Sequence, residues 1–149
     1  MSEPTAFQLA EALQRDSCFV VDWPLCQLRV MNDQQYPWFV MIPRRPDVTE
    51  LIDLSEQDYW QCQLEIRTFG RWLQQQFQPD KLNIAALGNM VPQLHIHQIA
   101  RYRTDLAWPA PIWGKVPMQP YAEAKLQQLI ELWQPSLAAK VPSSSSHGA

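Results

Sequence analysis

The chain has 149 residues, of which 46% are hydrophobic and 18% are charged, and its net charge is −3 at pH 7. These values are typical of one globular domain that can bury a substantial core. The small negative charge gives no electrostatic basis for binding a nucleic-acid backbone, so we expect no nucleic-acid partner. The sequence also lacks the Gly-rich phosphate loop of a P-loop NTPase.

Cysteine usage and the N-terminal sequence indicate the compartment. Cys18, Cys26 and Cys62 are odd in number, widely spaced and without a Cys-x-x-Cys pair, which predicts buried free thiols in a reducing environment. The N-terminus has neither the basic segment nor the apolar segment of a signal peptide. No apolar run is long enough to cross a bilayer. We therefore expect a cytoplasmic protein with no membrane partner.

The first part of the chain predicts a short helix and then three strands. Apolar residues share one helical face within residues 5–15. Apolar or alternating runs predict strands over residues 18–23, 25–31 and 38–42. The polar turn at residues 32–35 joins the second and third strands, which favours an antiparallel hairpin.

A long helix is predicted next, over residues 55–78. It begins with Ser55-Glu-Gln-Asp58, which has the form of a capping box, and its apolar residues recur at steps of three and four. This stripe indicates a core face. Trp60, Leu64 and Trp72 lie off the stripe, and they either widen it or face a second subunit.

The remainder of the chain predicts a second hairpin and a final helix. Strands over residues 81–87 and 93–100 are joined by a Gly-Asn turn. Prolines make residues 101–119 irregular, and helical spacing returns at residues 121–133.

The order of elements predicts an α+β fold with one antiparallel sheet of about five strands. The long helix packs across this sheet, and shorter helices flank it at the N- and C-terminal ends. We expect a single domain over residues 1–138 and a disordered Ser-rich tail over residues 139–149, which includes His147.

Two of the three histidines, His95 and His97, lie on the strand predicted over residues 93–100. Alternate residues of a strand share a face, so the two imidazoles are expected side by side. Imidazole can attack an electrophile, transfer protons or bind a metal near neutral pH. Two histidines without a cysteine or carboxylate in register are too few for a metal site, and we predict none. An exposed strand face without function is the simpler interpretation, but polar, basic and aromatic residues cluster beside the pair.

Residues 87–114, with Val91-Pro-Gln-Leu-His-Ile-His at their centre, resemble the signature of the histidine triad (HIT) superfamily. The resemblance is to small bacterial HIT-domain proteins, and it extends more weakly back to Cys18. The superfamily motif is His-φ-His-φ-His-φ-φ, in which φ is apolar. Its first two histidines match His95 and His97, and its third position is Ile99. The resemblance implies the HIT fold and a homodimer.

The resemblance also implies a reaction. In this superfamily the middle histidine, here His97, attacks the α-phosphate of a (di)nucleoside polyphosphate or nucleoside phosphoramidate, and water then hydrolyses the nucleotidyl-histidine. His95 would orient or contact the phosphate. Because Ile99 replaces the third histidine, the alternative is a nucleotide-binding protein with little or no turnover. No cofactor is required, apart from Mg²⁺ that the phosphates of the substrate would carry.

Four residues are predicted to bind the nucleotide. Asn32 matches the position that hydrogen-bonds the ribose hydroxyls in the superfamily, although a simple turn asparagine has the same pattern. Asn89 and Gln93 are candidate donors to the phosphoryl oxygens. Arg101, two residues beyond Ile99, is a candidate electrostatic substitute for the third histidine.

Three tryptophans have open roles. Some superfamily members carry a histidine where Trp38 stands, so that contact is altered here. Trp108 and Trp113 either stack on a base, cover the site as a lid from the partner subunit, or pack in the core. Arg103 and Asp105 are expected to pair with each other if neither serves the site.

Overall fold

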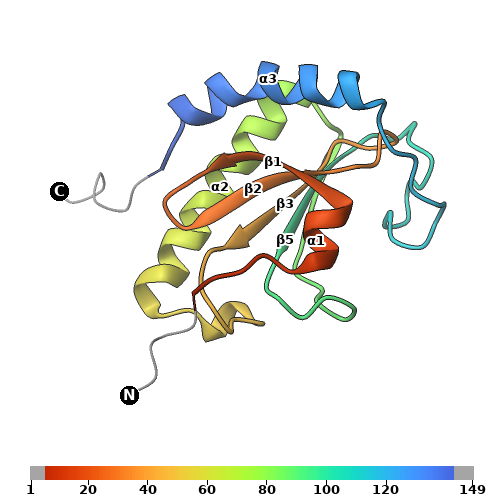
Figure 1. Ribbon diagram of the computed structural model, residues 1–149. Coiled ribbons are helices and arrows are strands. Elements are labelled where there is room, and N and C mark those ends of the chain that lie inside the picture. The colour runs from red at the N-terminus through yellow and green to blue at the C-terminus, as the bar shows by residue number, and fades with distance from the viewer. Residues whose placement is uncertain (1–5, 143–149) are drawn as a thin grey trace.

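The computed structural model describes residues 6–142, which form one five-stranded antiparallel sheet with helices on both faces (Figure 1). The elements are α1 (Glu11–Asp16), β1 (Ser17–Asp22), β2 (Cys26–Met31), β3 (Trp38–Pro43), the 3-10 helix η1 (Leu51–Asp53), α2 (Glu56–Phe77), β4 (Lys81–Ala85), β5 (Ile96–Arg101) and α3 (Glu123–Ala139). The strand order is β1-β2-β3-β5-β4, so β5 lies between β3 and β4. The predicted α+β architecture is confirmed.

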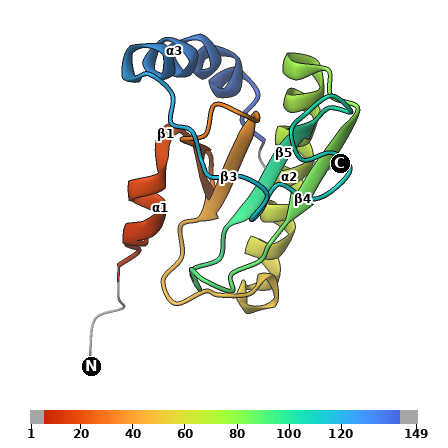
Figure 2. The same ribbon diagram turned by 90° about the vertical axis from the view of Figure 1, so that its right-hand side faces the viewer.

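The helices divide between the two faces of the sheet. Residues of α2 and α3 pack in one apolar cluster with one face of the strands, whereas Leu13 of α1 packs in a second cluster with the other face. Figure 2 shows α1 and α2 on opposite sides of the sheet. The second cluster also contains Ala107 and Ile112 from the irregular segment before α3. Within residues 6–142, no helix is long and apolar enough to cross a membrane.

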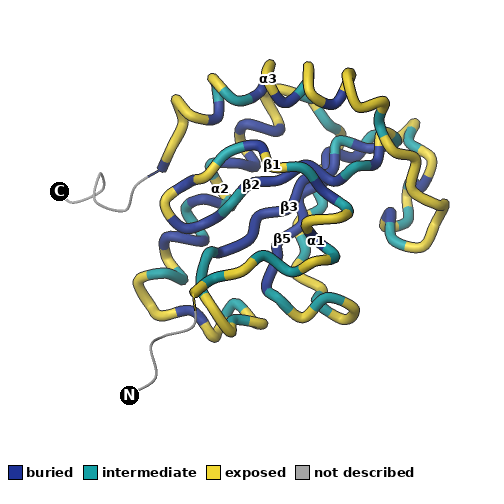
Figure 3. Tube along the Cα trace, viewed as in Figure 1, coloured by how far each residue is buried: buried dark blue, intermediate teal, exposed yellow. Residues whose placement is uncertain are grey.

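Strand β3 supplies side chains to both clusters because successive residues of a strand point to opposite faces. Phe39 and Met41 lie in the cluster with α2, and Trp38 and Val40 lie in the cluster with α1. All six residues of β3 are buried, and Figure 3 shows the central strands as the buried interior of the fold.

The long helix α2 has the limits that the sequence predicts. The Ser55 side chain accepts a hydrogen bond from the Asp58 backbone N–H at 3.2 Å, so the N-cap is formed. The helix ends at Phe77, after which Gln78 adopts a left-handed conformation with φ of 49°. Trp72, which lies off the apolar stripe, is 2% exposed within the core, whereas Trp60 is 61% exposed.

The N-terminal helix and the histidine strand are both shorter than predicted. Helix α1 begins at Glu11, and residues 6–10 are not helical. This segment is fixed by Gln93, whose Oε1 accepts from the Ala10 N–H at 2.8 Å and whose Nε2 donates to the Gln8 carbonyl at 2.8 Å. Strand β5 accordingly begins at Ile96, not at residue 93.

The C-terminal helix is longer than predicted. Helix α3 continues through Pro135 to Ala139, and Leu137 in its last turn is fully buried. The Leu137 carbonyl accepts from the Trp23 indole N–H at 3.1 Å, and the Pro142 carbonyl accepts from Gln61 at 3.1 Å. Of residues 139–142, which the sequence assigns to the tail, Ala139 is the last residue of the helix and Pro142 is buried, whereas Lys140 and Val141 are exposed. The rest of the predicted tail, including His147, lies outside the described residues.

The aromatic core around Phe39 yields a stability prediction. Phe39 is fully buried, and its ring lies 5.2 to 6.0 Å from the rings of Phe69, Trp72, Phe77 and Trp133. We expect Phe39→Ala to lower the free energy of unfolding by about 3–5 kcal/mol, measured by urea denaturation, because it leaves a cavity between sheet and helices. Phe19→Ala, at a side chain that is 44% exposed, serves as the control and should cost about 1 kcal/mol or less. Similar losses in the two variants would contradict this account of the core.

Candidate active site

The two histidines lie together on the α1 face of the sheet. His97 is in β5, where it pairs with Val40 of β3, and His95 immediately precedes the strand. Their ring centroids are 4.8 Å apart with an interplanar angle of 70°, and the two residues are only 5% and 7% exposed. The predicted side-by-side arrangement is therefore present in the structure.

The histidine pair forms part of the wall of a cleft of about 320 Å³. The other walls come from α1, from the ends of β2 and β3, from the loop between β4 and β5, and from the segment before α3. The lining residues besides the histidines are Ala12, Leu13, Asp16, Met31, Trp38, Leu87, Gly88, Asn89, Met90, Val91 and Trp113. This lining is mostly apolar, and it contains one carboxylate and no lysine or arginine.

His97 is held between two tryptophans. The Trp38 indole N–H donates to Nδ1 of His97 at 3.0 Å, and the Trp113 ring lies 5.2 Å from the His97 ring in an edge-to-face arrangement. Burial, and to a smaller extent the neighbouring His95, lower the pKa of His97 to about 3. His97 is therefore a neutral imidazole near pH 7.

Nδ1 of His95 contacts a backbone carbonyl, whereas Nδ1 of His97 contacts an indole N–H. Nδ1 of His95 lies 2.7 Å from the backbone carbonyl oxygen of Gln93, and this N–H···O contact fixes the plane of the ring. Ring orientation through a backbone carbonyl is a common means of preparing an imidazole for chemistry.

Ile99, at the third motif position, does not line the cleft. It is fully buried in the apolar cluster on the α1 face, and it pairs across the sheet with Trp38. No third imidazole therefore accompanies the pair. The additional polar group beside it is the indole N–H of Trp38, which comes from the neighbouring strand β3.

Of the three amide residues predicted to bind the nucleotide, Asn89 lines the cleft, whereas Gln93 and Asn32 do not. Gln93 is engaged with the N-terminal segment through both ends of its side chain. Asn32 lies at the end of β2, where its Oδ1 accepts from the Tyr121 N–H at 3.0 Å. Its neighbour Met31 reaches the cleft instead.

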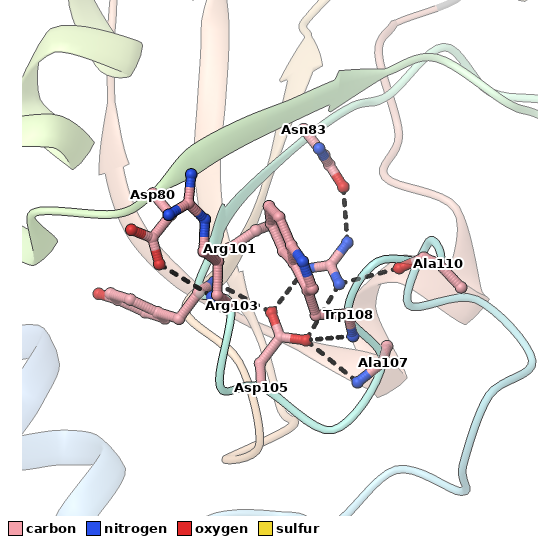
Figure 4. A network of polar contacts seen from close by, with 9 residues as sticks. Asp80, Asn83, Arg101, Arg103, Asp105, Ala107, Trp108 and Ala110 are labelled. Atoms are coloured by element: carbon pink, nitrogen blue, oxygen red, sulfur yellow. Dashed lines mark hydrogen bonds and ion pairs between the residues drawn. The ribbon is translucent and has the colours of Figure 1, made fainter.

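Arg101 is also placed away from the cleft, in a buried polar network (Figure 4). Its guanidinium pairs with Asp105 at 2.8 and 3.0 Å, and it also donates to the Asn83 side chain and the Ala110 carbonyl. Burial raises the pKa of Asp105, but hydrogen bonds from Arg101 and from backbone N–H groups outweigh it and lower the pKa to about 2. Asp105 thus pairs with Arg101 and not with Arg103, and the network shapes the segment that carries Trp113.

The structure also separates the roles of the aromatic residues. Trp108 lies beside the Arg101 guanidinium, with the ring centroid 5.7 Å away, whereas Trp113 lines the cleft. Leu13 and Asp16 are cleft residues that the sequence did not identify, and Trp38, the position of the altered contact, also lines the cleft. The hydrogen bond between Trp38 and His97 depends on the pairing of β3 with β5, which the sequence did not reveal.

Metal ligands do not gather around the pair. Across residues 6–142, no group of three or more histidine, cysteine, aspartate or glutamate side chains is arranged to hold a metal ion. Cys26 and Cys62 are buried free thiols, and Cys18 is half-buried. The absence of a protein metal site stays a prediction.

Comparison with known proteins decides the family. A model of the HIT domain matches residues 12–104, which include both histidines and Ile99. The chain belongs to the HIT domain family. Proteins of this family generally bind nucleotides and act as hydrolases or transferases.

Solved structures of histidine triad proteins agree with this assignment over nearly the whole chain. One from Bradyrhizobium japonicum is 41% identical with a TM-score of 0.84, and the match covers 93% of this chain and 100% of that chain. One from Marinobacter aquaeolei is 38% identical with a TM-score of 0.87, and the match covers 91% of this chain and 98% of that chain. One from Sinorhizobium meliloti is 37% identical with a TM-score of 0.81, and the match covers 84% of this chain and 93% of that chain. A comparison with curated proteins found no match.

The low pKa of His97 predicts how the stability of this HIT protein depends on pH. Folding lowers this pKa from 6.5 to about 3, so between these values the unfolded chain binds more protons than the folded protein. This contribution to stability is complete above about pH 6.5 and is lost as the pH falls. Between about pH 6.5 and 4 the loss is on the order of 3 kcal/mol, at about 1.4 kcal/mol per pH unit.

We expect His97→Asn to remove this part of the pH dependence. The asparagine amide oxygen can still accept from Trp38, but the side chain does not titrate. The measurement is the free energy of unfolding by urea at several pH values, with His147→Asn as the matched control. Identical pH dependence in wild type and His97→Asn would show that His97 titrates normally in the folded protein.

Proposed function

We propose that this HIT protein is a nucleotide hydrolase or nucleotidyl transferase that acts at the α-phosphate through a nucleotidyl-histidine intermediate. The substrate would be a (di)nucleoside polyphosphate or a nucleoside phosphoramidate. The observation that supports this proposal is the contact between two buried imidazoles in the wall of an apolar cleft. Family resemblance assigns the attacking ring to the middle motif position, His97.

The cleft has the size and chemistry for a nucleoside beside the reactive pair. Leu13, Met31 and Trp38 offer apolar and aromatic surface on which a base can be buried. Asn89 and the Gly88 backbone lie in the same lining, where they are candidate partners for phosphoryl oxygens. Asp16 at the α1 wall is a candidate acceptor for hydroxyl or amino groups of the nucleoside.

The lack of positively charged side chains in the cleft lining affects which leaving groups the site can accommodate. Because no lysine or arginine lines it, a long polyphosphate would bring several negative charges that no side chain there compensates. Mg²⁺ bound to the substrate would supply that compensation. A nucleoside phosphoramidate carries less charge, so its cleavage would need no metal ion.

The test is AMP release and intact protein mass during incubation with an adenosine phosphoramidate, diadenosine tetraphosphate or ADP. We expect wild type to release AMP and to carry a transient adenylyl adduct. The double variant His95→Ala/His97→Ala should do neither, and His147→Ala should match wild type. EDTA should suppress cleavage of the polyphosphates but not of the phosphoramidate.

A second candidate function is nucleotide binding with little or no turnover. Ile99 favours it, because this side chain is buried in the core and offers the cleft no third imidazole. Wild type that binds AMP, but forms no adduct and releases no AMP from any substrate, would establish this alternative and reject the enzyme.

We also propose that the protein is a homodimer formed along the β4 edge. β4 is an edge of the sheet, and Ile84 on it and Leu87 just beyond it are 49% and 47% exposed. The opposite edge, β1, packs against α3. An exposed apolar edge strand is suited to pairing with a symmetry-related copy.

Light scattering after size-exclusion chromatography tests the dimer. Ile84→Asp should give a monomer, because it places a charge within the interface. Phe19 on β1 is 44% exposed, and Phe19→Asp should remain dimeric. A monomeric wild type, or dissociation by Phe19→Asp alone, would contradict the proposal.

A further inference from the structure

The peptide group between Gln93 and Leu94 contacts His95 on one side and is itself held on the other. Its carbonyl oxygen lies 2.7 Å from Nδ1 of His95, and its N–H donates to the Val48 carbonyl at 3.0 Å. Because a trans peptide is planar, its C=O and N–H point in opposite directions and cannot turn separately. The hydrogen bond to Val48 therefore helps to fix the direction of the carbonyl that orients the His95 ring.

The loop over residues 46–49 presents the Val48 carbonyl through an uncommon backbone conformation. Asp47, directly before Val48, has a φ of 58°, in the left-handed region that residues other than glycine rarely adopt. Such a conformation persists where the surrounding structure holds it in place. This loop is the first anchor of the Gln93–Leu94 peptide, and it lies more than forty residues away in the sequence.

The side chain of Gln93 supplies a second anchor. Its Nε2 donates to the Gln8 carbonyl and its Oε1 accepts from the Ala10 N–H, both at 2.8 Å, so the amide joins segments 85 and 83 residues apart. With both ends of its amide engaged, this long side chain loses its rotamer freedom. The backbone of residue 93 is therefore tied to the N-terminal segment over residues 6–10.

These anchoring groups lie outside the cleft. The cleft lining contains His95 but not Gln8, Ala10, Val48 or Gln93. His95 itself is only 7% exposed, so its ring is enclosed by the groups that hold it. Any effect of the anchors on a bound substrate must therefore pass through the orientation of His95.

We propose that Gln93 is a positioning residue that couples the N-terminal segment over residues 6–10 to the ring of His95. Its amide fixes residue 93 to this segment, the loop over residues 46–49 fixes the following peptide N–H, and the carbonyl between them holds Nδ1 of His95. In the proposed nucleotide chemistry, on which the kinetic test below rests, His95 meets the phosphate beside His97. The N-terminal segment then controls the rate although it does not touch the substrate.

NMR of the free protein tests the coupling without any substrate. In ¹⁵N-histidine-labelled protein at alkaline pH, where imidazole is neutral, we expect the His95 proton on Nδ1 in wild type. Gln93→Met keeps an unbranched side chain but has no amide, so His95 should become a mixture of tautomers. Gln57→Met, at an exposed glutamine of α2, should leave His95 unchanged. An unchanged His95 in folded Gln93→Met would overturn the proposal.

A proline at residue 10 tests the same contact from the other partner. Ala10→Pro removes the N–H that donates to Gln93, and the φ of −56° at Ala10 suits the proline ring. It should shift His95 in the same direction as Gln93→Met but less, whereas Ala6→Pro, at an exposed residue of the same segment, should have no effect. Because both changes break one contact, the double variant should match Gln93→Met. Additive effects would show that the two residues act independently.

Steady-state kinetics with an adenosine phosphoramidate separate positioning from substrate binding. Gln93→Met should lower kcat about 10-fold, because the ring of His95 is no longer held in one orientation. KM should change by less than about twofold, because the residues that line the cleft are intact. A raised KM with unchanged kcat would overturn the proposal, since it would show that Gln93 binds the substrate directly.

The outcomes distinguish this coupling from the proposed function. AMP release by wild type, together with unchanged kcat and unchanged His95 signals in Gln93→Met, rejects the coupling and leaves the enzyme established. Wild type that releases no AMP rejects the proposed function, and the NMR comparison still decides the coupling. If Gln93→Met does not fold, the comparison of Ala10→Pro with Ala6→Pro decides it alone.

Discussion

The pairing of β3 with β5 is the constraint on which the rest of the site depends. It sets Val40 opposite His97 and Trp38 opposite Ile99, so an indole from one strand reaches an imidazole of the next. The same pairing sends Phe39 to the opposite face, where it packs among the aromatic rings of α2 and α3. One register thus builds the core on one side of the sheet and the histidine pair on the other.

Burial of the pair has a chemical consequence. The cleft is lined mainly by apolar side chains, and burial together with the neighbouring ring keeps His97 neutral. A neutral ring in a site of low polarity acts by its lone pair or by its N–H, and a hydrogen bond to the other nitrogen decides between them. Backbone and indole partners therefore matter as much to this site as the two imidazoles themselves.

The four predicted nucleotide-binding residues show where sequence reasoning meets its limit. Asn89 lies in a short loop next to His95, and local proximity was enough to place it in the cleft. Gln93 and Asn32 instead bond to segments distant in sequence, the N-terminal segment and Tyr121, and Arg101 bonds to Asp105, Ala110 and Asn83 away from the cleft. A polar side chain binds whichever partner the fold brings near, and strand alternation does not reveal that partner.

The sequence by itself determined the α+β class, the limits of α2, the HIT motif and the shared location of His95 and His97. These features depend on periodicity, capping and local spacing, which are properties of neighbouring residues. The tertiary structure alone decided that Trp38 bonds His97, that Arg101 is buried with Asp105, and that α3 continues through Pro135. The Trp38–His97 bond joins strands far apart in the chain, and the Arg101–Asp105 pair, although only four residues apart, is buried by the surrounding fold. In these places burial and the available hydrogen-bond partners outweigh local preference.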